Sequence, residues 1–390
     1  MNKIFNFFLL LTLFFLSFGQ LARISIPDRP IFFYSYELFL IILVALLFLK
    51  YKTLPLFKSG WQRYSLIFIS WTLASLLFSI NSYNVQENII AVLYLTRLIV
   101  YFLFGIYFSY HLTNVKNSNF NKVIFLFVVW VIFTSLIQYF FYPNIGNLAY
   151  LGWDPHIYRL VGLYLEPPIA ASILFIIAWY LYASEDFKYL NRFFKYILVT
   201  IPLILTILTF SRGAYLAIIV VIIFTLISKK KYKIMIALFI FIVTIIIALP
   251  RSNIESTNIF RTASVYSRID DYSKGLQIWR KHPIIGIGYN HIRSQKSAFD
   301  DEVYVEDYNP SHGISSFHSS FLIILATTGL IGLTIFLLLI HKIYALSFLT
   351  GGLIIFVSTI SILDNVLLHP IIMLTLFLII SREVSSQVRT

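Results

Sequence analysis

The sequence predicts an all-α polytopic membrane protein with about twelve transmembrane helices and one long loop on the outer face. Three observations support this fold class. Hydrophobic residues make up 59% of the 390 residues and charged residues only 12%, about half the charged share of ordinary soluble domains. Apolar runs recur at about the 20 residues that a helix needs to cross a bilayer. Basic residues are divided unequally between the two sets of loops.

The apolar runs follow one another along the chain and are separated by charged or proline-containing connections. We expect spans at 4–22, 31–49, 64–81, 89–110, 122–142, 167–183, 193–210, 212–228, 232–249, 317–340, 343–362 and 366–380. The first run could be a signal peptide, because Lys3 precedes it and Ser17-Phe18-Gly19 end it. It is long enough to span a membrane and no clear cleavage site follows, so we expect an uncleaved helix.

The positions of Lys and Arg predict the orientation. Twelve spans place both termini on one side. If that side is the cytoplasm, the cytoplasmic segments hold 17 Lys and Arg and the short outer loops hold 4, as the positive-inside bias requires. The four outer residues are Arg23, Arg29, Arg159 and Arg212. The net charge of +13 therefore reflects orientation, and we expect no nucleic-acid partner.

The predicted spans divide the chain into three parts. Residues 1–249 hold helices one to nine, 250–316 form the outer loop, and 317–390 hold the last three helices and a cytoplasmic tail. Within the loop, apolar residues at helical spacing predict an amphipathic helix on the membrane surface, ended by His282-Pro283 and followed by a tight turn at 286–288. These apolar residues are Ile269, Tyr272, Leu276 and Trp279.

Two candidate site residues lie where outer loops meet helix starts. Pro167-Pro168 suits a helix start, so Glu166 would lie at the outer mouth of the sixth helix, with Arg159 seven residues before it. Arg212 lies between two spans that almost no loop separates, and Gly213 would allow close approach. The alternatives are a helix cap for Glu166, an interfacial role for Arg159, and a side chain of Arg212 that reaches the headgroups.

Three more polar groups are candidates. His318 starts the tenth span, where an imidazole titrates near neutrality, and Gly329 and Gly332 of that span would give a small packing face. A capping or hydrogen-bonded interfacial histidine is the alternative reading of His318. Asp364, in the last outer turn, could orient a catalytic group or face water.

Arg97 lies inside the fourth span, so we expect it to face a polar interior, binding a lipid phosphate or pairing with Glu87. No phosphate loop or nucleotide-binding domain is apparent, and the acidic pair Asp270-Asp271 has no further metal ligands beside it. We expect no cofactor and no metal. Several arginines beside a membrane suit a phosphate or pyrophosphate head group.

A set of motifs resembles the O-antigen ligase and Wzy-type polymerase superfamily. The matching residues are Phe210-Ser211-Arg212-Gly213-Ala214, Arg268, Trp279, His282-Pro283, His318-Ser319 followed after nine residues by Gly329 and Gly332, and Asp364-Asn365 with His369-Pro370. Ligases usually continue this glycine pair with two threonines, whereas Leu333-Thr334 follows here. The pattern from Arg159 to Pro167 is similar to that of polysaccharide polymerases, so polymerase is favoured over ligase.

The resemblance implies a metal-independent glycosyltransferase of the bacterial inner membrane, active on the outer face. Its donor would be a glycan on undecaprenyl pyrophosphate. Its acceptor would be a sugar hydroxyl, on another lipid-linked repeat unit in a polymerase or on lipid A core in a ligase. Membrane lipid and a chain-length regulator are the further partners.

Individual roles follow from the resemblance. Arg212, with Arg159, Arg268 or Arg280, would stabilise the pyrophosphate, and His318 or Glu166 would take the acceptor's proton. Asp364 and Arg97 would support the site. A flippase for lipid-linked oligosaccharides is the rival reading. It would need a charged pathway through the bilayer, whereas the polar residues here gather on one face.

Overall fold

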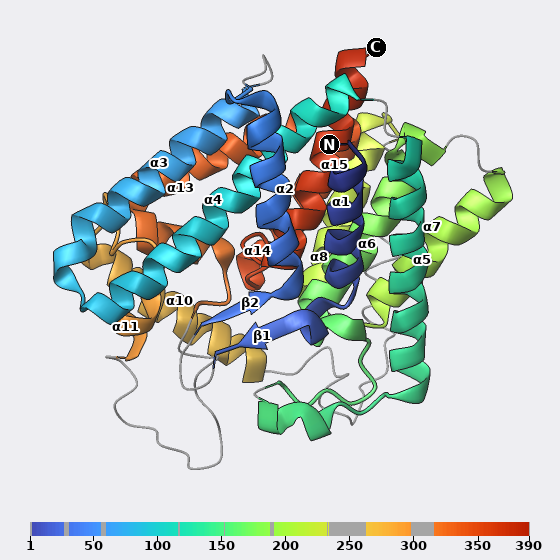
Figure 1. Cartoon of the computed structure of the whole chain (residues 1–390). Coiled ribbons are helices and arrows are strands. Elements are labelled where there is room, and N and C mark those ends of the chain that lie inside the picture. The colour runs from blue at the N-terminus through green and yellow to red at the C-terminus, as the bar shows by residue number, and fades with distance from the viewer. Residues whose placement is uncertain are drawn as a thin grey trace.

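The chain forms a bundle of helices with one short hairpin (Figure 1). The computed structural model describes residues 2–26, 31–55, 60–115, 118–151, 153–187, 191–231, 233, 263–297 and 316–389. The α-helices in these residues are α1 (Asn2–Ser17), α2 (Ser35–Tyr51), α3 (Trp61–Ser79), α4 (Val85–Asn114), α5 (Ser118–Phe141), α6 (Pro167–Ala183), α7 (Arg192–Ile207), α8 (Arg212–Ser228), α10 (Ala263–Lys281), α11 (Ile292–Ser297), α13 (Ser320–Tyr344), α14 (Phe348–Leu363) and α15 (Pro370–Arg389).

Shorter elements connect these helices. Strands β1 (Arg23–Ser25) and β2 (Phe32–Tyr34) pair antiparallel, with Arg23 opposite Tyr34. The 3₁₀ helices are η1 (Gly19–Ala22), η2 (Ile80–Ser82), η3 (Gly146–Leu151), η4 (Gly162–Tyr164) and η5 (Glu185–Phe187).

The apolar helices are those of an all-α integral membrane protein. Among the described residues, five are long and apolar enough to cross a bilayer: Trp61–Ser82, Val85–Asn114, Phe120–Phe141, Ser320–Tyr344 and Pro370–Val388. Four shorter apolar helices are Lys3–Ser17, Pro167–Ala183, Arg212–Ser228 and Phe348–Leu363. The predicted span at 232–249 lies outside the described residues, apart from Lys233. Each of the other predicted spans overlaps at least one of the helices named above.

Helix α6 lies in the core of the bundle. Nearly all of its residues are buried, as expected for a helix that is apolar on every side. It packs along α7 and also contacts α14 and α15, while α15 packs along α4 and α8 along α14. Apart from that between α6 and α7, these contacts join segments that are far apart in the sequence.

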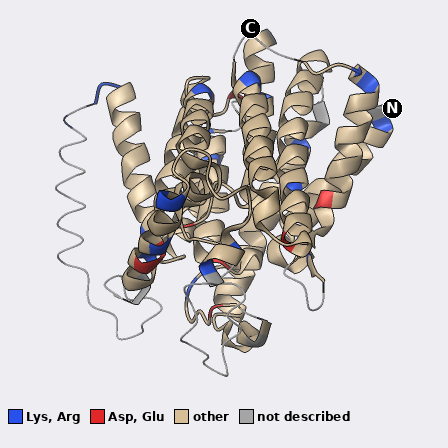
Figure 2. Ribbon diagram, turned by 90° about the vertical axis from the view of Figure 1, so that its left-hand side faces the viewer, with Lys and Arg blue, Asp and Glu red and all other residues tan. Residues whose placement is uncertain are grey.

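The two ends of the bundle are formed by different elements. Both termini lie at one end, which we call the terminal end (Figures 1 and 2). The β1–β2 hairpin, α10 and α11 lie at the other end, which we call the hairpin end (Figure 1). In Figure 2 many of the charged residues lie toward these two ends, and some lie between them. Because the termini share an end, the arrangement is the one expected of an even number of spans.

The structure corrects the predicted partner of Arg97. Its Nε lies 3.0 Å from Glu37 Oε1, and its Nη2 lies 3.1 Å from Glu37 Oε2 and also donates to the Phe32 carbonyl. The hydroxyl of Tyr101 donates to the same carboxylate at 2.9 Å. Glu87, the predicted partner, instead caps its own helix by accepting from Asn84 N–H at 3.1 Å. Sequence proximity misled the prediction, since the true partner is 60 residues away.

Helix α10 begins and ends within the predicted loop, and it stops at Lys281 just before His282-Pro283. The face that α10 buries against the protein is not centred on the apolar residues that we expect to lie on the membrane surface. Asp271, Gly275 and Ile278 face the protein, with the predicted Tyr272 and Leu276 at the margin. Ile269 is 60% exposed. The buried face therefore includes the carboxylate of Asp271 and the glycine Gly275. A search for apolar residues at helical spacing cannot identify such positions as buried.

Gly329 breaks α13 and does not form a packing face with Gly332. Its φ of 68° is non-helical, and a Cβ there would lie 2.1 Å from the Ile284 carbonyl oxygen. The turn at 283–288 fits into this break and satisfies the freed backbone groups. The bonds are Ile287 N–H to Ala326 C=O at 3.0 Å, Gly288 N–H to Thr327 C=O at 3.0 Å and Leu330 N–H to Pro283 C=O at 2.9 Å. The break thus anchors the segment after α10 to α13.

Candidate active site

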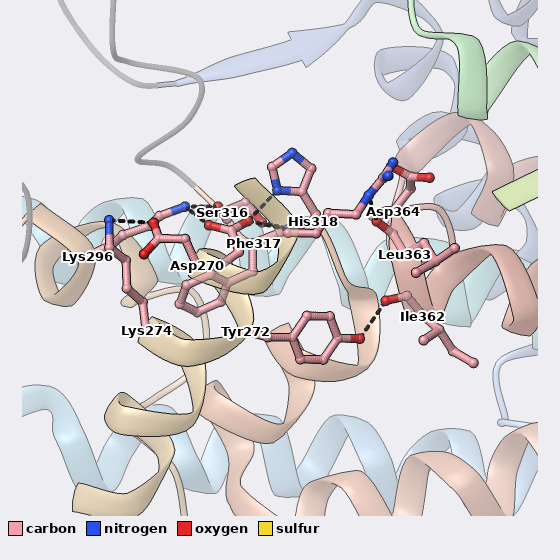
Figure 3. A network of polar contacts seen from close by, with 12 residues as sticks. Asp270, Tyr272, Lys274, Lys296, Ser316, Phe317, His318, Ile362, Leu363 and Asp364 are labelled. Atoms are coloured by element: carbon pink, nitrogen blue, oxygen red, sulfur yellow. Dashed lines mark hydrogen bonds and ion pairs between the residues drawn. The ribbon is translucent and has the colours of Figure 1, made fainter. Parts of the chain in front are cut away.

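A buried carboxylate at the hairpin end joins three donors (Figure 3). Asp271 of α10 is 5% exposed. Its Oδ1 lies 2.6 Å from Nζ of Lys296 on α11. Its Oδ2 accepts the backbone N–H of His318 at 3.0 Å and also contacts His318 Nδ1. One side chain therefore links α10, α11 and the start of α13.

The charge of Asp271 is stabilised by these contacts. Burial alone would raise the pKa of its carboxyl group, but the hydrogen bonds from His318 and Lys296 outweigh burial and hold the pKa below its usual range. The His318 side chain is 45% exposed. In Figure 3 its ring points away from the helices, between Lys296 on one side and Asp364 on the other. Its Nδ1 is held by Asp271, so Nε2 is the nitrogen left for another molecule.

An arginine–carboxylate pair lies beside this histidine. Arg268 precedes Asp271 by three residues on α10, which places both on one face of the helix. Its Nη2 lies 2.8 Å from Asp364 Oδ1, and its Nε donates to the Leu363 carbonyl at 2.9 Å. The second carboxylate oxygen of Asp364, Oδ2, is buried and has no hydrogen-bond donor among the described residues. Buried acceptors in proteins almost always have a hydrogen-bond donor, so Oδ2 could accept a hydrogen bond from a bound molecule.

Arg212 is the first residue of α8, next to this pair. Ser211 caps the helix by accepting Ala214 N–H at 3.4 Å. Gly213 allows the close approach that the sequence predicts, because a Cβ there would lie 3.2 Å from Asp364 Oδ2. The structure thus brings the half-buried Arg212 to the same corner as Asp364, at a helix N-terminus that favours anions.

Arg159 lies near this corner, but its guanidinium donates hydrogen bonds to backbone carbonyl groups. It is buried, and its Nε donates to the Thr209 carbonyl at 3.0 Å and its Nη2 to the Phe210 carbonyl at 3.2 Å. These carbonyls belong to the turn between α7 and α8. Arg159 therefore holds the turn from which Arg212 projects.

Glu166 is the N-cap residue of α6, at the predicted helix start. Gln20 Nε2 lies 3.4 Å from Glu166 Oε1 and 3.4 Å from His369 Nε2, and the Tyr34 hydroxyl donates to Gln20 Oε1 at 3.0 Å. Burial raises the pKa of Glu166 to about 7, helped by the nearby charges of Asp154 and Asp364 and opposed by those of Arg23 and His318. Glu166 therefore lies within electrostatic range of the other candidate residues.

Two predicted site residues lie apart from this group. Arg280 is exposed at the far end of α10. It lies twelve residues from Arg268, or about 18 Å along the axis at about 1.5 Å per residue. Arg97 is engaged with Glu37. In the described part of the chain, no three or more His, Cys, Asp and Glu side chains gather to hold a metal ion.

Sequence reasoning missed several residues of the site. Asp271 was noted only as half of an acidic pair, although its spacing of three from Arg268 placed both on one helix face. Lys296 and Gln20 carried no local signal, because their partners are 25 and 146 residues away.

The fold and the site define a class: a polytopic helical membrane protein with a cluster of paired charged side chains and an exposed histidine at its hairpin end. Residues 197–337 match the family model of O-antigen ligase, and the resemblance predicted from the motifs is confirmed over this part of the chain. The match contains α8, α10 and His318, whereas Arg159, Glu166 and Asp364 lie outside it. A comparison with curated proteins finds no match. The family supports a membrane enzyme of surface-polysaccharide biosynthesis with glycosyltransferase-like chemistry.

Proposed function

We propose that the protein is a polymerase that joins undecaprenyl-pyrophosphate-linked repeat units into a surface polysaccharide. The observation that carries this proposal is the corner formed by His318, Arg268, Asp364 and Arg212. It combines a proton acceptor with cationic groups, and the matched family region supplies three of its four residues. The unequal distribution of Lys and Arg supports cytoplasmic termini and a hairpin end on the outer face.

The proposed reaction is a direct displacement at the anomeric carbon. The acceptor oxygen forms a bond to that carbon while the bond to the pyrophosphate oxygen breaks, and the electron pair leaves with the pyrophosphate. The anomeric centre is inverted. The energy is stored in the lipid pyrophosphate, so the reaction needs no nucleotide on the outer face.

Arg268 and Arg212 stabilise the charge that develops on the leaving group. A guanidinium has five N–H donors, and the contacts to Asp364 and Leu363 use only two groups of Arg268. The N-terminus of α8 adds its own positive potential at Arg212. Such fixed donors, aimed at developing charge, are often the largest contribution to catalysis. We assign Arg159 a positioning role in the turn before Arg212, and Arg280 no contact with this pyrophosphate.

His318 Nε2 takes the proton from the acceptor hydroxyl. It lies on an exposed ring whose other nitrogen is held, which is the arrangement of a general base. Glu166 is the second candidate, since a carboxyl group with a pKa of about 7 is also matched to neutral pH. Asp364 supports the site by orienting Arg268.

Two alternative functions remain to be separated by experiment. The name of the matched family favours a ligase that transfers the glycan to lipid A core. A flippase would be suited by twelve spans and by Arg97 as a charge inside the membrane, but Arg97 is paired with Glu37.

Purified protein in proteoliposomes, given undecaprenyl-pyrophosphate-linked repeat units, separates the three functions. Elongated chains support a polymerase, transfer only to added lipid A core supports a ligase, and movement of unreacted substrate across the bilayer supports a flippase.

The site is tested with His318→Ala and Arg212→Ala, each of which should abolish transfer while the protein still inserts. Arg212→Lys should also fail, because a bidentate contact is lost. His341→Ala is the matched control, since His341 lies on the same helix α13 but in its last turn. Product of normal length from His318→Ala would reject the assigned base.

A further inference from the structure

The proposed reaction uses His318 but leaves the buried Asp271 without a role. A carboxylate that is 5% exposed is costly to bury unless its oxygens are well paired. Here both oxygens are paired, and two of the three contacts go to one residue, His318. The arrangement orients that residue more tightly than a helix cap requires, since Ser319 already caps α13 by accepting Leu322 N–H.

The contact with Asp271 determines which nitrogen of His318 carries the proton. An ionised carboxylate can only accept hydrogen bonds. A neutral imidazole that contacts it through Nδ1 must therefore carry its proton on Nδ1, and the lone pair is left on Nε2. The same oxygen accepts the backbone N–H of His318 at 3.0 Å. Asp271 thus restrains the backbone and the ring of this residue together.

Lys296 keeps Asp271 in the ionised state that this arrangement needs. Its Nζ lies 2.6 Å from Oδ1 and also donates to the Ser316 carbonyl at 3.0 Å. Lys296 is 5% exposed, so the pair is screened little by solvent. Among the described residues, the pair of Arg268 on α10 and Asp364 at the end of α14 lies on the side of His318 away from Lys296, and Glu166 at the start of α6 interacts electrostatically with His318.

We propose that Asp271 is the positioning residue that sets the tautomer and orientation of His318, with Lys296 as its supporting cation. This inference rests on the proposed function. When Nε2 takes the proton of the acceptor hydroxyl, the ring becomes an imidazolium, and the adjacent carboxylate stabilises that charge. The proton then passes from Nε2 to water after the product has left.

The neighbouring Asp270 offers a matched control. It pairs with Lys274 on the outside of the same helix, and its side chain is 61% exposed against 7% for Asp271. Asp270→Asn and Asp271→Asn make the same chemical change one residue apart. Figure 3 shows Asp270 with Lys274, apart from the ring of His318.

The test measures transfer of lipid-linked repeat units by the full-length variants in proteoliposomes. Asp271→Asn should lower kcat by about 10²-fold or more, because an analogous change in Ser–His–Asp enzymes costs about 10⁴-fold through the wrong tautomer. The KM for the lipid-linked donor should stay within about threefold, since Asp271 does not touch it. Asp270→Asn should match the wild type, and Asp271→Glu should recover part of the lost rate. Equal rates for Asp270→Asn and Asp271→Asn would overturn the proposal.

A second measurement is made on the wild-type protein, and a variant is needed only to assign the signal. Nitrogen NMR of ¹⁵N-histidine-labelled wild-type protein in nanodiscs, with His318→Ala to assign the signal, reports the tautomer directly. We expect the proton on Nδ1 of the neutral ring, and a proton on Nε2 would overturn the proposal. If His318→Ala still transfers glycan while the Nδ1 tautomer is observed, the assigned base fails and the positioning contact stands.

Discussion

The two ends of the bundle each hold an Arg–Asp pair, and the two pairs are built differently. At the terminal end, Arg382 of α15 contacts both oxygens of Asp186, with Nε at 3.1 Å from Oδ1 and 2.9 Å from Oδ2. Tyr180 and Asn121 donate to the same carboxylate at 2.7 and 3.3 Å. At the hairpin end, Arg268 reaches only Oδ1 of Asp364, and Oδ2 has no donor among the described residues.

We interpret Arg382–Asp186 as a structural ion pair. The pair Arg268–Asp364 instead has a carboxylate oxygen without a donor among the described residues. With a further contact from Arg382 Nη2 to Oδ1, five donor contacts occupy both oxygens of Asp186, and they tie α15 to the connection after α6. The open oxygen of Asp364 lies beside Gly213 and the start of α8, and the exposed His318 is next to it. A buried polar group without a hydrogen-bond partner lowers stability. Proteins keep such groups chiefly at functional sites, where a substrate can supply the missing partner.

The sharpest test of this contrast is the same substitution in both pairs. Arg268→Met should lower the rate of transfer by about 10²–10³-fold, because a donor to developing charge is lost. Arg382→Met should instead lower the free energy of unfolding by about 3–5 kcal/mol, because the buried Asp186 loses its counter-charge and keeps only Tyr180 and Asn121 as donors. Its rate per folded molecule should stay within about threefold. Transfer assays and denaturant titrations in nanodiscs measure both quantities.

The reverse pattern would break the comparison. If Arg382→Met stops transfer in folded protein while Arg268→Met does not, the terminal end holds the site. The double variant Arg382→Met with Asp186→Asn should recover most of the lost stability, since no unpaired charge then remains.

Glu166 at the hairpin end should make the stability of the protein depend on pH. Its pKa is raised from 4.5 to about 7 in the folded protein, so the folded state binds a proton that the unfolded state releases between these values. Stability should therefore fall as the pH rises through this window, by at most about 3.4 kcal/mol at about 1.36 kcal/mol per unit. Glu166→Gln, which resembles the protonated form, should remove this dependence. Melting temperatures from pH 4.5 to 8 measure it.

The control for this pH dependence is Glu185→Gln, at an exposed position in η5 at the terminal end. It should keep the wild-type slope. An unchanged slope in Glu166→Gln would show that other groups cause the dependence and that Glu166 is ionised in the folded protein.

The smallest expected effect concerns two buried tyrosines at the hairpin end. The hydroxyl of Tyr34 donates to Gln20, whereas that of Tyr164 has no partner among the described residues. Tyr34→Phe should cost about 1–2 kcal/mol, because a buried acceptor loses its donor, and Tyr164→Phe should cost close to nothing. Denaturant titration of the two variants measures the difference. Equal losses would mean that the Gln20 contact adds no stability.

The sequence by itself determined the positions of the helices and of some helix starts, which depend on interactions between residues close together in the chain. Apolar runs located the helices, because a helix in lipid satisfies its own backbone groups. Pro167 placed the start of α6, and the short connection before Arg212 placed the start of α8. The motif residues also identified the superfamily that the match over 197–337 confirms.

Only the tertiary structure decided which side chains meet. The contact between Asp271 and His318 joins residues 47 positions apart, and that between Arg97 and Glu37 joins residues 60 apart. The break at Gly329 likewise depends on the turn at 283–288, which supplies its missing hydrogen bonds. Hydropathy and spacing report the environment of each residue along its own helix. The partner of a buried charge is instead selected by the packing of distant helices, which brings one of several available donors within hydrogen-bonding distance.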